Sequence, residues 1–332
     1  MKRVLLFLLV SMFTAGLLIG CGSGGTDTGS QDQSTNDSSE QTEDTGETAE
    51  SAFPLTVTDA LDNEVTIDDK PERIVSVIPS NTEIAFALGL GDEIVGVSDH
   101  DNYPEEVKEK ERIGGLEMNI EVIISLKPDL VLAHASSAES SQEGLQQLRD
   151  SGIDVFVVHD AQDIEGTYQS IKQIGKVTGT EEKAADIVSG MKEDFASISE
   201  KAEAVSEDER KSVFFEVSPA PDIYTAGKNT FFDALLQVVH ADNAAKELDG
   251  WVPIDPEAIL EMNPDVIVTT YGSTVDNPVK KVMNRDGWGD MNAVANEQVY
   301  DVPSDLVSRP GPRLTEGAKE IAKVVYPEIF EE

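Results

Sequence analysis

Two glutamates stand at the same place in two copies of one sequence pattern. Residues 119–133 read N-I-E-V-I-I-S-L-K-P-D-L-V-L-A, and residues 255–269 read D-P-E-A-I-L-E-M-N-P-D-V-I-V-T. Each copy predicts a cap, a short helix, a Pro-Asp turn and a buried strand. Glu121 and Glu257 fall in the first helical turn, where the helix dipole stabilises a carboxylate by about 0.3–1 kcal/mol. The other interpretation is a two-point charged contact with a partner of two-fold symmetry.

Other polar residues follow a predicted buried strand at residues 74–78. Ser80 and Asn81 come next in the chain. In a parallel α/β sheet, ligands bind at the loops after strands, so these two residues are candidates for a binding site. Backbone N–H groups at this point could receive an acidic group of a ligand. Helix capping is the alternative role.

Arginine is informative because cations are scarce in this chain. Asp and Glu total 64 against 25 Lys and Arg, which gives a net charge of -39. Such a charge repels nucleic acid, so we exclude that class of partner. Arg309 and Arg313, in S-R-P-G-P-R, are candidates for attracting phosphate or carboxylate groups, with Arg309 preferred.

Strands and helices alternate along the chain from about residue 53. This order predicts an α/β fold with parallel sheets, built twice. A hairpin is expected at 55–58 and 65–67; the other predicted strands are 74–78, 93–97, 129–133, 155–158, 213–217, 266–270 and 299–302, and the predicted helices are 82–88, 120–126, 142–150, 164–178, 229–239, 256–262 and 314–326.

One long helix is predicted at residues 180–206, between the two halves. Apolar residues recur there at three- and four-residue steps, as in Ala184, Val188, Met191 and Phe195. The chain is therefore divided into an N-terminal lobe at 53–179, the helix, and a C-terminal lobe at 207–332, with two Rossmann-like lobes and a cleft between them.

The N-terminus predicts export. A basic start precedes an apolar run of about 17 residues, too short for a comfortable membrane span. Residues 1–20 are interpreted as a signal peptide ending before Cys21, the only cysteine in the chain. Residues 21–52 are acidic and rich in Ser, Thr and Gly, so they predict a disordered tether.

Six segments in this order resemble the substrate-binding lipoproteins of ABC importers, in the group for cobalamin, ferric siderophores and haem that includes vitamin B12-binding proteins. They are the lipobox L-I-G-C, I-V-S-V-I-P-S-N-T-E-I-A-F-A-L-G-L-G, G-x-x-x-N-x-E-x-I-x-x-L-K-P-D-L-V, the middle helix, W-x-x-x-x-x-E-x-I-L-x-x-N-P-D-V-I and S-R-P-G-P-R-L-x-E-G. The resemblance covers about residues 70–330. It implies two lobes joined by one rigid helix, lobes that rotate little on binding, and a ligand held between them.

The resemblance also implies roles for single residues. Glu121 and Glu257 match the glutamates that dock onto arginines of the permease dimer, and Cys21 matches the lipidated cysteine. Tyr224 and Trp251 match aromatic pocket positions, since an aromatic ring offers a flat apolar surface to a macrocycle. His100 and His134 stand where vitamin B12-binding proteins carry aromatic residues, which is a departure from that pattern.

The resulting hypothesis is a monomeric, lipid-anchored binding protein on the extracytoplasmic face of the cell membrane. It would deliver a corrinoid, a ferric siderophore or haem to a permease and its ATPase, with no catalytic cofactor. His100 or His134 could ligate the metal of the chelate or only donate a hydrogen bond. The alternative is capture of Zn or Mn, although no His-rich acidic loop is present. An enzyme is disfavoured because the chain lacks G-x-S-x-G, a P-loop and a dinucleotide-binding loop.

Overall fold

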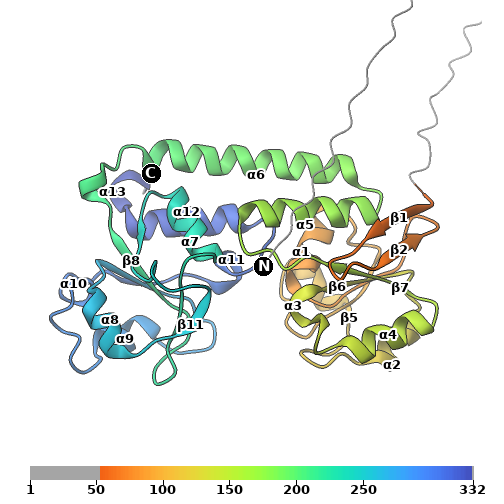
Figure 1. Cartoon of the computed structure of the whole chain (residues 1–332), viewed down its shortest axis with the longest axis horizontal. Helices are drawn as coiled ribbons and strands as arrows, with labels where there is room; N and C mark the ends of the chain where they lie inside the picture. The colour runs from red at the N-terminus through yellow and green to blue at the C-terminus, as the bar shows by residue number, and fades with distance from the viewer. Residues whose placement is uncertain (1–52, 331–332) are drawn as a thin grey trace, which may run out of the picture. The chain divides into compact units, whose positions relative to one another are not determined.

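The computed structural model describes residues 53–330. The predicted signal peptide at 1–20, Cys21 and the predicted tether at 21–52 lie outside these described residues. Figure 1 shows the arrangement of the described elements.

The N-terminal lobe is built on a five-stranded sheet in the order β5-β4-β3-β6-β7, and all of its strands are parallel. Every residue of the inner strands β3 and β6 is buried, as expected for a parallel sheet covered on both faces. The elements of this lobe are β1 (Leu55–Thr58), β2 (Glu64–Ile67), β3 (Ile74–Ser76), α1 (Pro79–Ala87), β4 (Ile94–Val97), the 3-10 helix η1 (Glu105–Glu109), β5 (Glu111–Arg112), α2 (Ile120–Leu126), β6 (Leu130–His134), α3 (Ala135–Ala138), α4 (Gln142–Asp150), β7 (Asp154–Val158) and α5 (Ile164–Val177).

The C-terminal lobe repeats the plan with a four-stranded parallel sheet in the order β10-β8-β12-β13. A small antiparallel sheet, β9 with β11, accompanies it. The elements are η2 (Glu207–Glu209), β8 (Ser212–Glu216), β9 (Tyr224–Ala226), α7 (Phe231–Val238), β10 (Asp242–Asn243), β11 (Trp251–Pro253), α8 (Pro256–Met262), β12 (Val266–Thr269), α9 (Pro278–Met283), α10 (Asn292–Ala295), β13 (Val299–Asp301), α11 (Ser304–Val307), α12 (Leu314–Val325) and α13 (Pro327–Phe330).

The long helix α6 (Glu181–Ala202) connects the two lobes. Its buried stripe includes Val188, Met191, Phe195 and Ile198. The helix packs against α5 of the N-terminal lobe and against α7, α12 and α13 of the C-terminal lobe (Figure 1). One hydrophobic cluster therefore runs from Ile84 through this stripe to residues of the C-terminal lobe. Burial of a shared apolar face couples the lobes through the helix.

The sequence repeat is also a structural repeat. Helices α2 and α8 each have seven residues, and each ends at a left-handed residue, Lys127 with φ 49° or Asn263 with φ 45°. A Pro-Asp pair follows both. Asp129 Oδ2 accepts hydrogen bonds from the backbone just before β3, and Asp265 Oδ2 accepts one from Ser212 at the start of β8. The two lobes thus fix their first strands in the same way.

The predicted boundary between the first strand and the first helix is wrong. The sequence suggested a strand through Ile78 and a helix from Thr82, but β3 ends at Ser76 and α1 begins at Pro79. Proline suits the first helical position because its missing N–H and fixed φ cost nothing there. Ser80 and Asn81 therefore belong to the first turn of α1.

Candidate functional site

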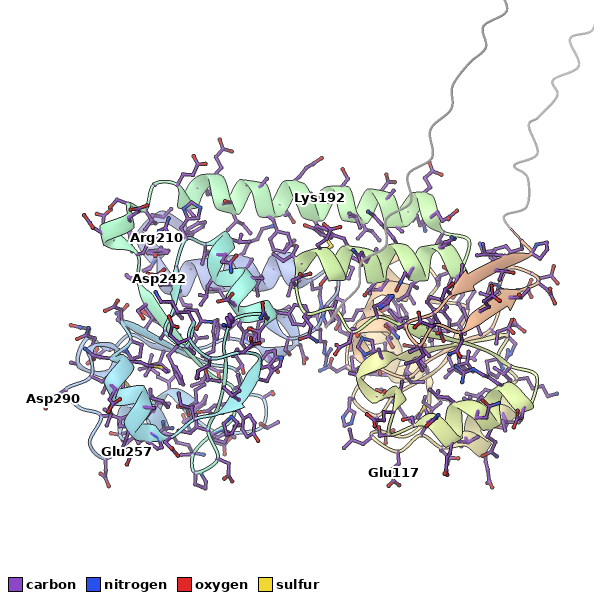
Figure 2. The ribbon with its side chains drawn as sticks, in the orientation of Figure 1. Glu117, Lys192, Arg210, Asp242, Glu257 and Asp290 are labelled. Atoms are coloured by element: carbon purple, nitrogen blue, oxygen red, sulfur yellow. The ribbon has the colours of Figure 1, made fainter. Side chains whose placement is uncertain are left out.

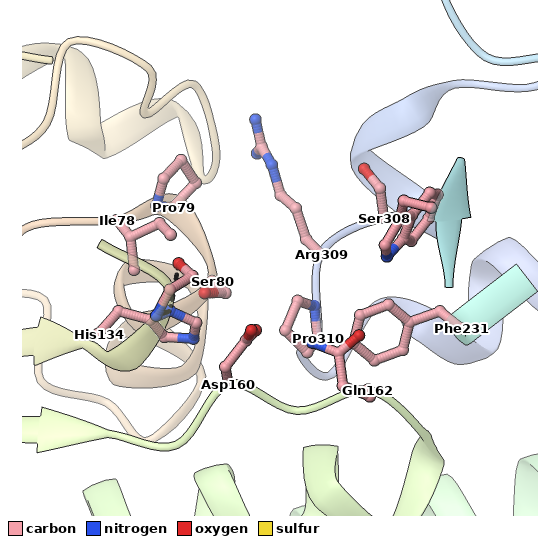
Figure 3. Close-up of a pocket in the computed structure, with 12 residues that line it drawn as sticks. Ile78, Pro79, Ser80, His134, Asp160, Gln162, Phe231, Ser308, Arg309 and Pro310 are labelled. Carbon is pink, nitrogen blue, oxygen red and sulfur yellow. Dashed lines mark hydrogen bonds between the residues drawn. The ribbon is translucent and has the colours of Figure 1, made fainter. Parts of the chain in front are cut away.

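A cavity of about 440 Å³ lies between the two lobes, and we call it the interlobe cavity. Figure 3 shows His134, Ser80 and neighbours on one side, Phe231 and Ser308 on the other, and Arg309 between them. The N-terminal lobe contributes Ile78, Pro79, Ser80, His134, Ser136, Asp160 and Gln162, and the C-terminal lobe contributes Phe231, Trp251, Ser308, Arg309 and Pro310. Its volume and mixed lining are typical of small-molecule sites.

The C-terminal side of the cavity is an aromatic wall formed by Trp251 and Phe231. Trp251 is 39 % exposed, and its ring meets Phe232 edge-on at 5.2 Å between centroids. Phe232 in turn stacks on Phe215 at 4.4 Å. A half-exposed tryptophan held by buried rings offers a rigid apolar surface, which suits contact with a flat ligand.

The N-terminal side presents two hydrogen-bonding side chains, Ser80 and His134. The Ser80 hydroxyl is buried and has no hydrogen-bond partner within the described residues. His134 Nδ1 accepts from the backbone N–H of Ser136. Burial lowers the pKa of His134 below its ordinary value of 6.5, and the charge of Asp160 offsets part of this effect. The imidazole is therefore neutral at pH 7. Nδ1 also lies 2.8 Å from the Ser136 hydroxyl, so Nε2 is the ring nitrogen left to face a ligand.

A second cavity adjoins the first and shares Ile78, Pro79 and Ser136 with it. We call it the serine cavity, because hydroxyl groups dominate its polar lining. Its volume is about 540 Å³, and its other lining residues are Val77, Ser98, His100, Gly115, Leu116, Glu117, Met118, Ser137, Ser140 and Ser141. A Cβ at Gly115 would approach His100 Nε2 to 3.0 Å, so glycine leaves room for the imidazole. His100 and His134 thus lie in neighbouring cavities.

An ion cluster centred on the buried Glu83 connects the lobes beside the interlobe cavity. We call it the interlobe clamp; its members are Glu83, Asn102, Asp305, Arg309 and Arg313. Glu83, 2 % exposed, accepts from Arg309 Nη1 at 2.8 Å, from Arg313 Nη2 at 2.6 Å and from Arg313 Nε at 2.8 Å. Arg309 also contacts Asp305 and Asn102. Burial lowers the pKa of Arg313, but hydrogen bonds and the charge of Glu83 outweigh this and raise it.

The clamp changes the interpretation of Arg309. The sequence predicted a free cation for ligand acids, whereas two carboxylates already compensate its charge. Arg309 lines the cavity, and its guanidinium also holds α1 to the segment after α11. Arg313 stacks on Tyr103 at 3.9 Å in the same cluster.

Two other predicted residues lie apart from the interlobe cavity. Asn81 is 1 % exposed, and its amide donates to the backbone oxygens of Leu132 and Ala133 in β6. It fastens α1 to the sheet and caps no helix. Tyr224 is 43 % exposed and pairs with Pro253 between β9 and β11, but it is not among the residues lining the interlobe cavity.

The sequence analysis missed Asp160, Gln162 and Phe231. Asp160 and Gln162 follow β7, at the carboxyl edge of the same parallel sheet. Their position after a predicted buried strand was the signal that could have identified them. Phe231, the first residue of α7, was hidden within an apolar helix pattern.

Glu121 and Glu257 occupy equivalent positions, the second residue of α2 and of α8. Both side chains are exposed. Helices α2 and α8 lie on the side of their lobes away from α6 (Figure 1), and Figure 2 shows Glu257 at that edge. The pair is free for contact with another protein.

Comparison with known proteins assigns the chain to a class. The model of the periplasmic binding protein family matches residues 74–306, so the chain belongs to that family. Its members are solute-binding proteins.

Individual relatives narrow the class further. The chain is 49 % identical over 321 residues to the "Uncharacterized ABC transporter substrate-binding lipoprotein YvrC" of Bacillus subtilis (strain 168), covering 97 % of this chain and 96 % of the relative. It is 29 % identical over 291 residues to the "Cobalamin-binding protein" of Halobacterium salinarum (strain ATCC 29341 / DSM 671 / R1), covering 83 % of this chain and 75 % of the relative.

A solved structure shows a related fold. It is that of a possible iron-binding, periplasmic solute-binding protein from Staphylococcus epidermidis ATCC 12228. Sequence identity is 41 %, the TM-score is 0.70, and the match covers 78 % of this chain and all of that one. The predicted two-lobed α/β fold and the membership in this group of importer proteins are confirmed.

Two properties of residues 53–330 bear on other functions. Within that range, none of the helices combines the length and apolarity that crossing a membrane requires. The same residues contain no group of three or more His, Cys, Asp or Glu side chains placed to hold a metal ion. Two of these relatives are named for binding cobalamin or iron, so the Zn or Mn alternative is not favoured.

Proposed function

We propose that this protein captures a metal chelate, of the corrinoid, ferric siderophore or haem type, and delivers it to the permease of an ABC importer. The interlobe cavity carries the proposal, because both lobes line it and Trp251 and Phe231 give it an aromatic wall. Polar groups at Ser80, His134 and Asp160 would orient the ligand. The proposed role of the cleft is to bind and release the ligand, without catalysis.

His134 would act as a hydrogen-bond donor to the chelate. Its Nδ1 is occupied by Ser136, and its pKa is lowered by burial. Binding would then depend on the shape and periphery of the chelate more than on a bond to its metal. Tyr224 and His100 remain candidates for contact with a ligand that extends beyond the interlobe cavity.

Docking to the permease dimer would use Glu121 and Glu257. The structural repeat supports this, because it places one exposed carboxylate on each lobe at the same point of the same seven-residue helix. Arginine on the partner could bind each carboxylate through two charge-assisted hydrogen bonds. One monomer would thereby present a pseudo-symmetric pair of contacts to a two-fold receptor.

Attachment at the extracytoplasmic face would use Cys21 as the lipidated residue. The lipobox Leu18-Ile19-Gly20-Cys21 supports this, as does the lipoprotein name of the Bacillus subtilis relative. Mass spectrometry of the protein from membranes, compared with a Cys21→Ser variant in the medium, tests the anchor.

The delivery step is tested by uptake in cells that depend on this importer for a chelate. The Glu121→Arg/Glu257→Arg double variant should abolish uptake while ligand binding by the purified protein is unchanged. A matched control is Glu139→Arg/Glu247→Arg, because these glutamates are also exposed, lie one on each lobe and belong to neither α2 nor α8. Normal uptake by the docking variant would show that these glutamates are not the contact.

A further inference from the structure

The charged side chains that line the interlobe and serine cavities attract some chelates and repel others. Among their lining residues, Arg309 is the one Arg or Lys side chain, while Asp160 and Glu117 supply carboxylates. Arg309 is compensated within the interlobe clamp, where Glu83 and Asp305 balance Arg309 and Arg313. Neither Asp160 nor Glu117 has a hydrogen bond or an ion pair among those recorded for the described residues. The cleft therefore carries uncompensated negative charge.

His134 does not change this balance. Its lowered pKa keeps the imidazole neutral at pH 7. The protein as a whole has a net charge of -39, which adds a repulsive field for any anion that approaches. A ligand that carries several negative charges thus meets no uncompensated arginine or lysine in the cleft.

The hydroxyl groups are mostly arranged as acceptors. Ser137 donates its proton to the backbone oxygen of His134, Ser140 to that of Ser137, and Ser308 to that of Ser304. Ser98 donates to Asp101. A hydroxyl that donates its hydrogen bond to another group of the protein can still accept a hydrogen bond from a ligand. With Asp160 and Glu117, these oxygens form a surface that can accept hydrogen bonds from N–H and O–H groups of a ligand.

We infer that the cleft selects a chelate without net charge, whose periphery presents N–H and O–H donors such as carboxamide or hydroxamate-peptide groups. Chelates that carry free carboxylates or catecholates are disfavoured. A carboxamide suits this polar lining, because its NH₂ group donates to Asp160 or the serines while its oxygen accepts from Ser80 or His134. The inference rests on the proposed function and names the chemistry of its ligand.

Four probes at low ionic strength test the inference, with affinity measured by titration calorimetry and by tryptophan fluorescence. They are cyanocobalamin and a ferric trihydroxamate, both without net charge, and haemin and a ferric tris-catecholate, both anionic. At least one uncharged probe should bind at least about tenfold more tightly than either anionic probe, because the carboxylates of the cleft repel each negative charge of the ligand. The difference should shrink at about 1 M salt, where the Debye length is about 3 Å.

A charge variant makes the test specific to the cleft. Asp160→Asn removes a negative charge from the cleft and keeps an oxygen acceptor, so it should strengthen tris-catecholate binding by about fivefold relative to binding of the uncharged probe. The matched control is Asp186→Asn, an exposed acid on α6 outside both cavities. Tighter binding of haemin or tris-catecholate by the unaltered protein would overturn the inference and leave the proposed function standing. Failure of all four probes to bind would instead overturn the proposed function.

Discussion

Removal of the Glu83 carboxylate should destabilise the protein more than any exposed glutamate can. Glu83→Ala leaves Arg309 and Arg313 facing each other in the interlobe clamp, with side chains only 14 % and 15 % exposed. Loss of one partner from a buried ion pair costs about 3–5 kcal/mol, because a desolvated charge remains. Asp305 still compensates Arg309 in part, so we expect the lower end, about 3 kcal/mol.

Urea unfolding followed by circular dichroism measures this loss, with Glu139→Ala as the matched control in an exposed part of the same lobe. A thermal scan should show a midpoint lower by roughly 6–12 °C. Arg313→Ala and the double variant complete a thermodynamic cycle, and the interaction energy between Glu83 and Arg313 should exceed about 1 kcal/mol. The reasoning is refuted if Glu83→Ala costs no more than Glu139→Ala, or if the two single effects simply add.

Two further predictions concern the interlobe cavity. Trp251→Ala should weaken binding of the tightest chelate by about 1.5–3 kcal/mol through the loss of apolar contact, as measured by calorimetry. Tyr300→Ala, which lies outside the cavity, should leave the affinity unchanged. Equal effects of the two substitutions would contradict the role of the aromatic wall. His134 has a lowered pKa, so its unfolded form gains a proton below about pH 6.5 before the folded form does, and stability should fall as the pH is lowered through this range. His134→Asn should lose that part of the pH dependence in urea unfolding between pH 7.5 and 5.5, and an unchanged slope would count against a buried neutral imidazole.

The periodic spacing of apolar residues in the sequence predicted most of the fold. The spacing of Val188, Met191 and Phe195 predicted α6, because one helical face had to be apolar to be buried. The matched helix caps at Asn119 and Asp255 predicted the repeat of α2 and α8. These features are local, so each can be deduced from a short stretch of the chain.

The site depends on contacts that no local pattern encodes. Glu83 lies within a helix, and its partners Arg309 and Arg313 are more than 200 residues away. Tyr224 and Trp251 occupy three-residue strands that become a sheet only when they pair. The sequence pointed to Ser80, His134, Trp251 and Arg309, which lie around one cavity, but the pairing that compensates Arg309 appeared only in the structure.

The central claim is that a metal chelate binds between the lobes, against the aromatic wall. The crystal structure of the protein with its tightest-binding chelate tests it most directly. The account predicts one chelate per chain, packed on Trp251, with its periphery bonded to Ser80 Oγ and to Nε2 of His134. A chelate bound outside the interlobe and serine cavities would contradict the account, and so would a bond between the metal of the chelate and a ring nitrogen of His134.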